Sequence, residues 1–376
     1  MKKLIRLLAL ALAFTLIAAA CGDDDDTGSD DDAGGDSAGV AAAQAIVDAN
    51  SAPFDTITPS TPLDSVPEAK TVGWLQCELP SCSAITPGFE DATAALGWTL
   101  ESISIESFNP APGFQQAIDL GVDYIAVTGT PPALMQDQID AAAEAGIPLM
   151  SCFDTTDPDG PNNNIWTNCG DDDDVSGAGN LLANAIIADS NGTANVLMVN
   201  IPDFAVLVSE REGAEEAYAD NCPGCTFNEL AVTIDQLLAG DVPGAVVSAI
   251  QADDGIDYVH FAFDGLTGGV SATLEEAGLL EGRNLVGVDF SGAVLQEIVD
   301  GTHQFWTANP KEYAAWIMVD AMARHSIGQD NPDERSSADL PNWIATADTA
   351  GDWIASDGWP GPDTMADQFM ALWGVG

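Results

Sequence analysis

The chain has 376 residues with 60 acidic and 9 basic side chains, which gives a formal net charge of −51 at pH 7. A chain this acidic repels phosphates, so nucleic acid is excluded as a partner, and anionic headgroups will not hold its folded part. The acidic excess favours solubility through surface charge, and a salt-rich or acidic habitat is the alternative explanation.

Residues 1–20 predict an export signal. The stretch MKKLIR carries three basic residues, and the 14 residues from 7 to 20 are uncharged and almost wholly apolar. A membrane span needs roughly 20 apolar residues, whereas a basic start, a short apolar run and small residues are typical of a cleaved leader. Cleavage would leave 6 basic against 60 acidic residues, a net charge of −54.

Cys21 follows three alanines directly and resembles the lipobox cysteine of bacterial lipoproteins, which is acylated and becomes the new N-terminus. Ala18 stands where Leu is usual, and the alanines would also suit ordinary cleavage that releases a soluble protein. We favour the lipoprotein, because residues 22–43 hold eight Asp and no basic residue and cannot bury enough apolar surface to fold. Residues 21–69 are therefore predicted to be a lipidated cysteine and a disordered acidic and Pro-rich tether, which would anchor the exported protein to the outer face of the cell membrane.

Six further cysteines are expected to form disulfides, because their number is even and the expected compartment is oxidising. Proximity suggests the pairs that close three short loops: Cys77–Cys82, Cys152–Cys169 and Cys222–Cys225. A zinc site is the alternative for CPGC at 222–225, but no second CxxC or His pair accompanies it.

From about residue 70 the chain alternates apolar runs with amphipathic stretches. Buried strands are predicted at 71–76, 99–105, 123–129, 147–154, 195–200, 257–264 and 284–290. Helices are predicted at 84–96, 112–121, 133–145, 175–189, 208–220, 242–252, 268–278, 292–300 and 311–327, with Gly97, Gly121, Gly146 and Gly278 as C-caps. This alternation predicts an α/β fold with parallel sheets, and its length favours two lobes.

Three segments carry a resemblance to the type I periplasmic binding proteins. FQQAIDLGVDYIAVTGTPPALMQDQIDAAAEAGIPLMSCFD resembles the first lobe of that family, and HFAFDGLTGGVSATLEEAGLLEGRNLVGVDF resembles its second-lobe signature. IVDGTHQFWTANPKEYA resembles the last crossover between the lobes. The resemblance spans roughly residues 70–328. It implies two Rossmann-like lobes joined by a three-strand hinge, a ligand site between them, and delivery of a small solute to the permease of an ATP-driven (ABC) importer.

The expected lobes are discontinuous in sequence. The N-terminal lobe comprises residues 70–170 plus 310–335, and the C-terminal lobe comprises residues 171–309 plus 336–376. Parallel sheets bind ligands beyond the carboxyl ends of their strands. Polar side chains stand at those ends here: Gln76, Glu78, Asp154, Asp264, Asp289 and Asn309.

Each of these Asp residues could instead cap a helix, although Ser291 is better placed than Asp289 to cap 292–300. In the family that the chain resembles, Asp residues at the positions of Asp154 and Asp289 accept hydrogen bonds from ligand hydroxyls. Such charge-assisted bonds are stronger than neutral ones.

The chain also departs from the family pattern. CELPSC replaces the aromatic pair that pentose and hexose binders usually carry after the first strand, and Phe263 stands where sugar binders commonly have Asn. In SEREGAEEA, Gly213 aligns Glu210 with the ligand-clamping Arg of the family, while a slip of one residue would restore Arg211 to that role. An aromatic ring such as Phe263 could stack on a ligand, since pockets mix aromatic walls with a few polar groups.

No catalytic set accompanies these residues: the sequence has no GxSxG elbow, P-loop or HExxH motif, and its three histidines are scattered. An enzyme is therefore disfavoured, and no cofactor is expected. The acidic runs 157–160 and 171–174 lack the full calcium-loop pattern, so no metal site is assigned. We expect a solute-binding lipoprotein that closes on a small ligand, a sugar or polyol first and a cation second. The alternative is a sensory module that presents a signal molecule to a membrane kinase.

Overall fold

The computed structural model describes residues 37–329 and 339–376, which all belong to one compact unit. The predicted leader and Cys21 lie outside the described residues. None of the helices in these two ranges combines the length and the apolar character needed to cross a membrane.

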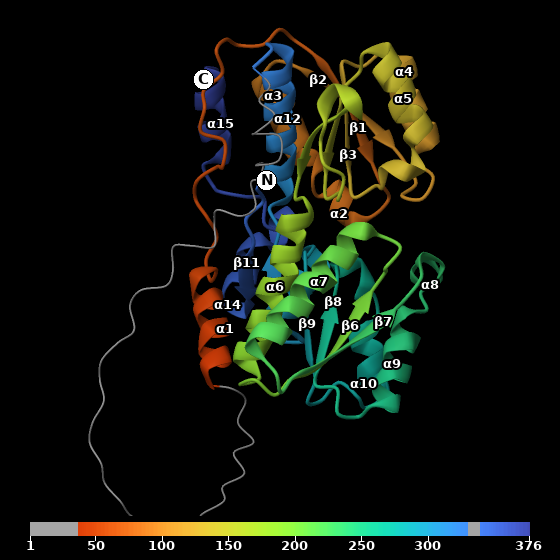
Figure 1. The fold of residues 1–376 in the computed structure, drawn as a ribbon, viewed down its shortest axis with the longest axis vertical. Helices are drawn as coiled ribbons and strands as arrows, with labels where there is room; N and C mark the ends of the chain where they lie inside the picture. The colour runs from red at the N-terminus through yellow and green to blue at the C-terminus, as the bar shows by residue number, and fades with distance from the viewer. Residues whose placement is uncertain (1–36, 330–338) are drawn as a thin grey trace, which may run out of the picture. The chain divides into compact units, whose positions relative to one another are not determined.

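The N-terminal lobe is built on a five-stranded sheet in the order β2-β1-β3-β4-β5 (Figure 1). Its strands, all parallel, are β1 Thr71–Gln76, β2 Thr99–Ser104, β3 Tyr124–Thr128, β4 Leu149–Cys152 and β5 Ile165–Cys169. Its helices are α2 Pro80–Ser83, α3 Thr86–Ala95, α4 Ala111–Leu120, α5 Gln136–Ala145 and α12 Lys311–Ser326. Every residue of β3 and β4 is buried, as expected for central parallel strands that are covered on both faces.

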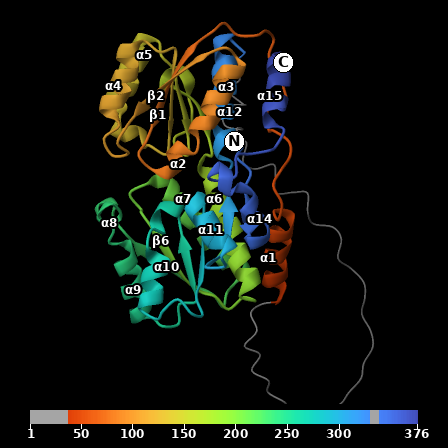
Figure 2. The same ribbon diagram turned by 180° about the vertical axis from the view of Figure 1, so that it is seen from behind.

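The C-terminal lobe contains a six-stranded sheet in the order β11-β10-β9-β8-β6-β7. Its strands are β6 Asn195–Asn200, β7 Thr226–Ala231, β8 Tyr258–Phe261, β9 Asn284–Val288, β10 His303–Ala308 and β11 Trp343–Thr346. Its helices, several seen from behind in Figure 2, are α6 Asp172–Asp189, α7 Ala205–Asn221, α8 Ile234–Ala239, α9 Val242–Ala252, α10 Val270–Glu276, α11 Gly292–Val299 and α14 Ala347–Ala350. The sequence predicted parallel sheets. This sheet departs from the prediction at its edge, because β11 runs antiparallel to β10.

The two sheets confirm the predicted α/β class and the two-lobe organisation. The four glycines predicted as C-caps all adopt the left-handed conformation, with φ between 68° and 72°. The strands β5, β7 and β11 were not predicted, and β10 was not among the seven predicted apolar runs. In β7 the reason is plain, because this edge strand has no fully buried residue and therefore no apolar run in its sequence.

All three disulfides suggested by proximity are present. Their Cα–Cα distances are 5.6 Å for Cys77–Cys82, 4.4 Å for Cys152–Cys169 and 5.4 Å for Cys222–Cys225. Cys152 and Cys169 are paired neighbours on the parallel strands β4 and β5, so this disulfide links two adjacent strands of one sheet.

Residues 37–69 are folded, which corrects the predicted tether for this part of the chain. Helix α1, Ser37–Ala49, packs against α6 of the C-terminal lobe and buries Ala43 completely. A Cβ atom at Gly39 would overlap the backbone oxygen of Asn221, so the two segments approach as closely as backbones can. The dense run of aspartates ends at Asp36, and an alanine-rich helical sequence with Asp48 as its one acidic residue follows.

The chain changes lobe five times among the described elements, where three crossings were expected. The expected three follow β5, β10 and α12. The first extra crossing is the segment from α1 to β1. The second leads from the 3-10 helix η4, Gly351–Ser356, to helix α15, Met365–Trp373.

Helix α15 corrects the predicted C-terminal lobe of residues 336–376. Whereas β11, α14 and η4 do join that lobe, α15 packs on α12 of the N-terminal lobe. The Trp316 ring of α12 stacks on Phe369 at 5.4 Å and on Trp373 at 5.3 Å between ring centroids. The C-terminal helix thus completes the aromatic core of the N-terminal lobe.

Candidate functional site

A cavity of about 160 Å³ lies between the two lobes. The N-terminal lobe contributes the loops that follow its strands, including Cys77, Gly129 and Phe153. The C-terminal lobe contributes the first turns of α6 and α7 and the residues that follow β8 and β9. The cavity therefore lies at the carboxyl ends of both sheets, where the α/β fold places ligand sites.

Two cavity residues hold equivalent places in the two lobes. Phe153 follows β4 and Asp289 follows β9, the fourth strands of the corresponding sheet orders. Both have left-handed backbones, with φ of 57° and 58°. Such a conformation is costly for residues other than glycine and is concentrated at functional sites. The counterpart of Asp289 is therefore Phe153 and not Asp154. At these equivalent positions the cavity has an aromatic ring in the N-terminal lobe and a carboxylate in the C-terminal lobe.

Asp289 is paired with the one lysine of the cavity lining. The Nζ atom of Lys311 contacts the Oδ1 atom of Asp289, and Lys311 is only 4% exposed. The neighbouring Asp264 is buried just behind, where its backbone N–H donates to the Asp289 carbonyl at 3.2 Å. Burial, and then the negative charge of Asp289, raises the pKa of Asp264 to about 6. Asp264 does not line the cavity and acts on it through Asp289 and Lys311.

The sequence left open whether Glu210 or Arg211 faces the ligand, and in the structure Glu210 lines the cavity. Its side chain lines the cavity, while Arg211 pairs with Glu215 and lies 3.9 Å (Nε to Oε2) from Glu229, outside the lining. Arg211, predicted as a possible clamp on the ligand, therefore does not line this cavity. Close backbone contact between α6 and α7 at their glycines fixes this orientation, because a Cβ at Gly213 would overlap the backbone oxygen of Ser176 and one at Gly179 would overlap that of Glu210.

The carboxyl group of Glu210 is buried against a histidine. Its Oε1 atom lies 3.1 Å from Nε2 of His260, on β8. Burial raises the pKa of Glu210 well above its ordinary value, and the nearby Asp289 raises it further. Burial also lowers the pKa of His260 to about 3. Both shifts favour the uncharged forms of the two side chains.

Asp174 is a cavity carboxyl group that was not predicted from the sequence, where the run 171–174 was considered as a calcium loop. Asp171 caps α6 by accepting hydrogen bonds from the N–H groups of Asp173 (3.0 Å) and Asp174 (3.3 Å). Asp174 itself turns inward and accepts a hydrogen bond from the N–H of Leu340 at 3.1 Å. Burial raises its pKa to about 7, with smaller contributions from Asp171 and Asp339.

Of the other predicted site residues, Phe263 and Asn309 line the cavity. The Oδ1 atom of Asn309 is buried and has no hydrogen-bond partner among the described residues. Asp154 lines an adjoining cavity of about 190 Å³ instead. There its Oδ1 atom accepts a hydrogen bond from the N–H of Thr156 at 2.6 Å, while its Oδ2 atom is buried without a partner in the described part of the chain.

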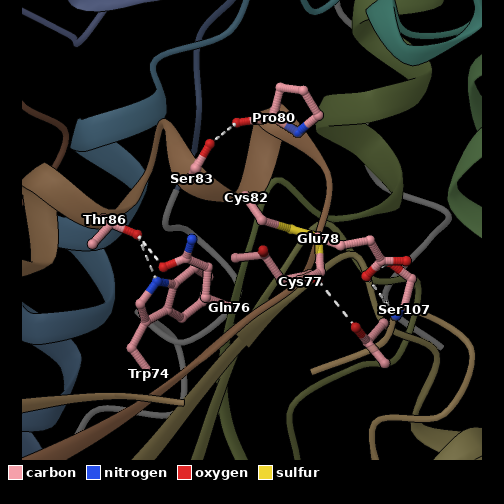
Figure 3. Close-up of a disulfide and its surroundings, with 11 residues drawn as sticks. Trp74, Gln76, Cys77, Glu78, Pro80, Cys82, Ser83, Thr86 and Ser107 are labelled. Atoms are coloured by element: carbon pink, nitrogen blue, oxygen red, sulfur yellow. Dashed lines mark hydrogen bonds between the residues drawn. A yellow bond between two sulfur atoms is a disulfide. The ribbon is translucent and has the colours of Figure 1, made fainter. Parts of the chain in front are cut away.

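Gln76 and Glu78 do not line the cavity but hold the loop that does (Figure 3). Gln76 accepts a hydrogen bond from the Thr86 hydroxyl at 3.1 Å. Glu78 accepts hydrogen bonds from the N–H (3.0 Å) and hydroxyl (3.1 Å) of Ser107. The Cys77–Cys82 disulfide closes the loop, and both of its cysteines form part of the cavity wall. The two residues predicted as ligand contacts therefore support the site from behind.

Two α/β lobes that face each other across a cavity at the ends of their strands define a bilobal small-molecule-binding protein. The model of the periplasmic binding protein domain family matches residues 81–330, and the chain belongs to this family. It is thus a binding protein rather than an enzyme, and the family implies an extracytoplasmic location.

Solved structures support this assignment at the level of the fold. An ABC transporter solute-binding protein from Mycobacterium smegmatis with bound glycerol shares 17% identity over 76% of this chain and 97% of that one, with a TM-score of 0.64. A 5-methylthioribose transporter solute-binding protein from Thermotoga lettingae in complex with 5-methylthioribose shares 18% identity over 84% and 99%, with a TM-score of 0.66. A carbohydrate transporter from Acidothermus cellulolyticus in complex with myo-inositol shares 19% identity over 76% and 97%, with a TM-score of 0.63. No curated protein sequence matches the chain significantly.

Proposed function

We propose that the protein captures a small polyhydroxylated solute outside the cytoplasm and delivers it to an ABC importer. The observation that carries the proposal is the composition of the cavity between the lobes. Three phenylalanines, Phe153, Phe204 and Phe263, line it together with carboxyl, amide and hydroxyl groups. Rings can cover the C–H faces of a sugar or cyclitol while the oxygen atoms bind its hydroxyl groups. The related structures contain glycerol, myo-inositol and 5-methylthioribose, which are ligands of this kind.

Capture would proceed by closure of the lobes. A ligand in the cavity meets Phe153 and Thr128 of one lobe and Asp289 and Glu210 of the other. Because only a closed arrangement makes both sets of contacts, the ligand stabilises that arrangement by its difference in affinity for the two states. Closure also excludes water and strengthens the polar contacts within.

Within the cavity, Asp289 and Asn309 would accept hydrogen bonds from ligand hydroxyls. Lys311, held against Asp289, would donate one. Asp154 would serve a ligand that extends into the adjoining cavity, since the two cavities share Phe153 and Phe204.

We further propose that export and an N-terminal lipid on Cys21 hold the protein at the outer face of the membrane. The support is the sequence of the leader and the small residues that precede Cys21. Mass spectrometry of the membrane-extracted protein would show an acylated N-terminal cysteine. Recovery of the protein in the culture supernatant with an unmodified N-terminus would contradict the anchor.

A thermal-shift screen of the purified protein against sugars, polyols, amines and nucleosides tests the ligand class, because binding raises the melting temperature by mass action. For a ligand found in this way, Asp289→Ala should weaken binding by more than tenfold, roughly the cost of removing a buried charged acceptor. If no sugar or polyol, neutral or amine-bearing, raised the melting temperature, the proposed ligand class would be wrong. If binding were unchanged in Asp289→Ala, the site would lie elsewhere.

A further inference from the structure

The charges that line the cavity are unbalanced. Three carboxyl groups line it, those of Asp174, Glu210 and Asp289, against one cation, Lys311. Lys311 is already paired with Asp289. No arginine or histidine belongs to the lining among the described residues. Asp174 and Glu210 therefore line the cavity without a cationic partner in the described ranges 37–329 and 339–376.

The aromatic side chains surround the same space. Phe153 enters from the N-terminal lobe, and Phe204 and Phe263 enter from the C-terminal lobe. Phe204 directly precedes α7, the helix that carries Glu210. The ring and the carboxyl group therefore both come from the N-terminal half of this helix and the residue before it. The faces of aromatic rings attract cations, most strongly where water is excluded. Carboxyl groups and phenyl rings together form a surface that suits a positively charged group.

The buried polar side-chain atoms of the lining that lack a partner among the described residues are acceptors. The buried Oδ1 atoms of Asn309 and Asn342 have no hydrogen-bond partner in the described part of the chain. A ligand that satisfies them must supply donors. An ammonium group supplies three donors and no acceptor, whereas a hydroxyl group supplies one donor and brings acceptor lone pairs of its own.

We propose that the ligand of this cleft is an amine-bearing polyol, such as an amino sugar or an aminocyclitol, whose ammonium group binds between Asp174 and Glu210 beside the phenylalanine rings. This inference rests on the proposed function and narrows its ligand class from polyols in general to cationic ones. The hydroxyl groups of the ligand would contact Asp289, Asn309 and Lys311.

The protonation of the two carboxyl groups agrees with this geometry. Burial raises the pKa of both, that of Asp174 to about 7 and that of Glu210 well above its ordinary value, so that each shift favours the protonated carboxyl group. The groups facing Glu210 are His260, which is neutral, and Asp289; those facing Asp174 are Asp171 and Asp339. None of these supplies a positive charge. An arriving ammonium group would stabilise the ionised carboxylates, so its binding would release protons to the solvent.

Matched ligands distinguish a cationic from a neutral requirement. Melting temperatures and calorimetric affinities would be measured with D-glucosamine, D-glucose and N-acetyl-D-glucosamine, with the corresponding galactose series, and with 2-deoxystreptamine against myo-inositol. The amine should bind at least about tenfold more tightly than its neutral counterpart in at least one series. Calorimetry at pH 7 in two buffers of different ionisation enthalpy should show proton release for the amine alone.

Equal or tighter binding of the neutral members would overturn the inference and leave the proposed function standing. Absence of binding by every member of these series would instead contradict the proposed ligand class itself, and the inference with it.

Variants separate the charge from the fold. Glu210→Gln keeps the shape of the side chain and a polar contact to His260, and should abolish the amine preference with at least about a tenfold loss of affinity for the amine. Asp174→Asn should also reduce the preference for the amine and the affinity for it. Glu216→Gln removes a carboxyl group from the exposed side of the same helix and should change nothing. If Glu210→Gln and Asp174→Asn, both folded by circular dichroism, retained the full amine preference, the inference would be overturned.

Discussion

Glu210 and His260 form a hydrogen-bonded pair, 3.1 Å between Oε1 and Nε2, and neither side chain is more than 1% exposed. Replacing His260 by Leu would leave the Glu210 carboxyl group buried without its partner. We expect the free energy of unfolding to fall by about 1–3 kcal/mol, the cost of an unsatisfied buried polar group. His260→Gln, which can still hydrogen-bond, should lose less. Urea unfolding of the two variants measures the difference, and equal losses would show that the pair is not the cause.

The pH dependence of stability should reveal Asp174. Its pKa is 3.8 ordinarily and about 7 in the folded protein, so between these values the folded state holds a proton that the unfolded state has lost. The free energy of unfolding therefore decreases as the pH rises through this window. In Asp174→Asn the decrease between about pH 5 and about pH 8 should be smaller than in the wild type.

When the wild type and Asp174→Asn are measured over the same pH range, the contributions of the other titrating groups to the free energy of unfolding cancel in the difference. His260, whose lowered pKa costs stability as the pH falls below 6.5, acts in the opposite direction but is the same in both proteins. Identical slopes for the wild type and Asp174→Asn would mean that Asp174 is not protonated in the folded state at mildly acidic pH.

The close contact of α6 and α7 positions Glu210, and Gly213 makes this contact. A Cβ atom at Gly213 would collide with the backbone of Ser176, so Gly213→Ala should destabilise the protein by about 1–3 kcal/mol through overpacking. Because the helix that carries Glu210 would shift, ligand affinity should fall as well. Gly177→Ala is the control on α6: nothing lies within 4 Å of a Cβ there, and the change should be neutral or stabilising by up to about 1 kcal/mol. Equal stability of the two variants would contradict the packing argument.

The Cys77–Cys82 disulfide should matter for binding as well as for stability. Changing both cysteines to Ser removes a short covalent loop, at a cost of about 2 kcal/mol, and loosens a wall of the cavity. The matched control is Cys222→Ser with Cys225→Ser, which opens a similar loop at the opposite end of α7 from the cavity. Both double variants should lose stability in chemical denaturation, but only the first should lose ligand affinity. Equal affinities would show that the loop does not shape the site.

The fold could be predicted from the sequence wherever burial left a continuous apolar run. β3 and β4 are buried along their whole length and were found, whereas β7 is half exposed and was missed. The tether prediction failed for residues 37–69 because it rested on composition. Small residues such as Gly39 and Ala43 give little hydrophobic signal, yet they let α1 approach the C-terminal lobe closely.

The site was harder to predict, because its geometry depends on which way each side chain turns. Asp154 and Asp289 look alike in sequence, both near the end of a buried strand. The structure shows that the left-handed residue after the strand is Phe153 in one lobe and Asp289 in the other. That one-residue offset directs Asp154 into the adjoining cavity. Asp174 gave no signal distinct from the aspartates beside it, since only one side of the first turn of α6 faces the cavity.

Helices α1 and α15 lie outside the segment that the family model matches, and so does β1, a central strand of its sheet. A recombinant fragment trimmed to residues 81–330 would lack the strand between β2 and β3 and would uncover Trp316 where Phe369 and Trp373 now cover it. Open strand edges and bare indole rings promote aggregation. A recombinant form of this protein should therefore start at or before Ser37 and retain the C-terminal helix α15. The segment matched by the family model is shorter than the part of the chain that folds cooperatively.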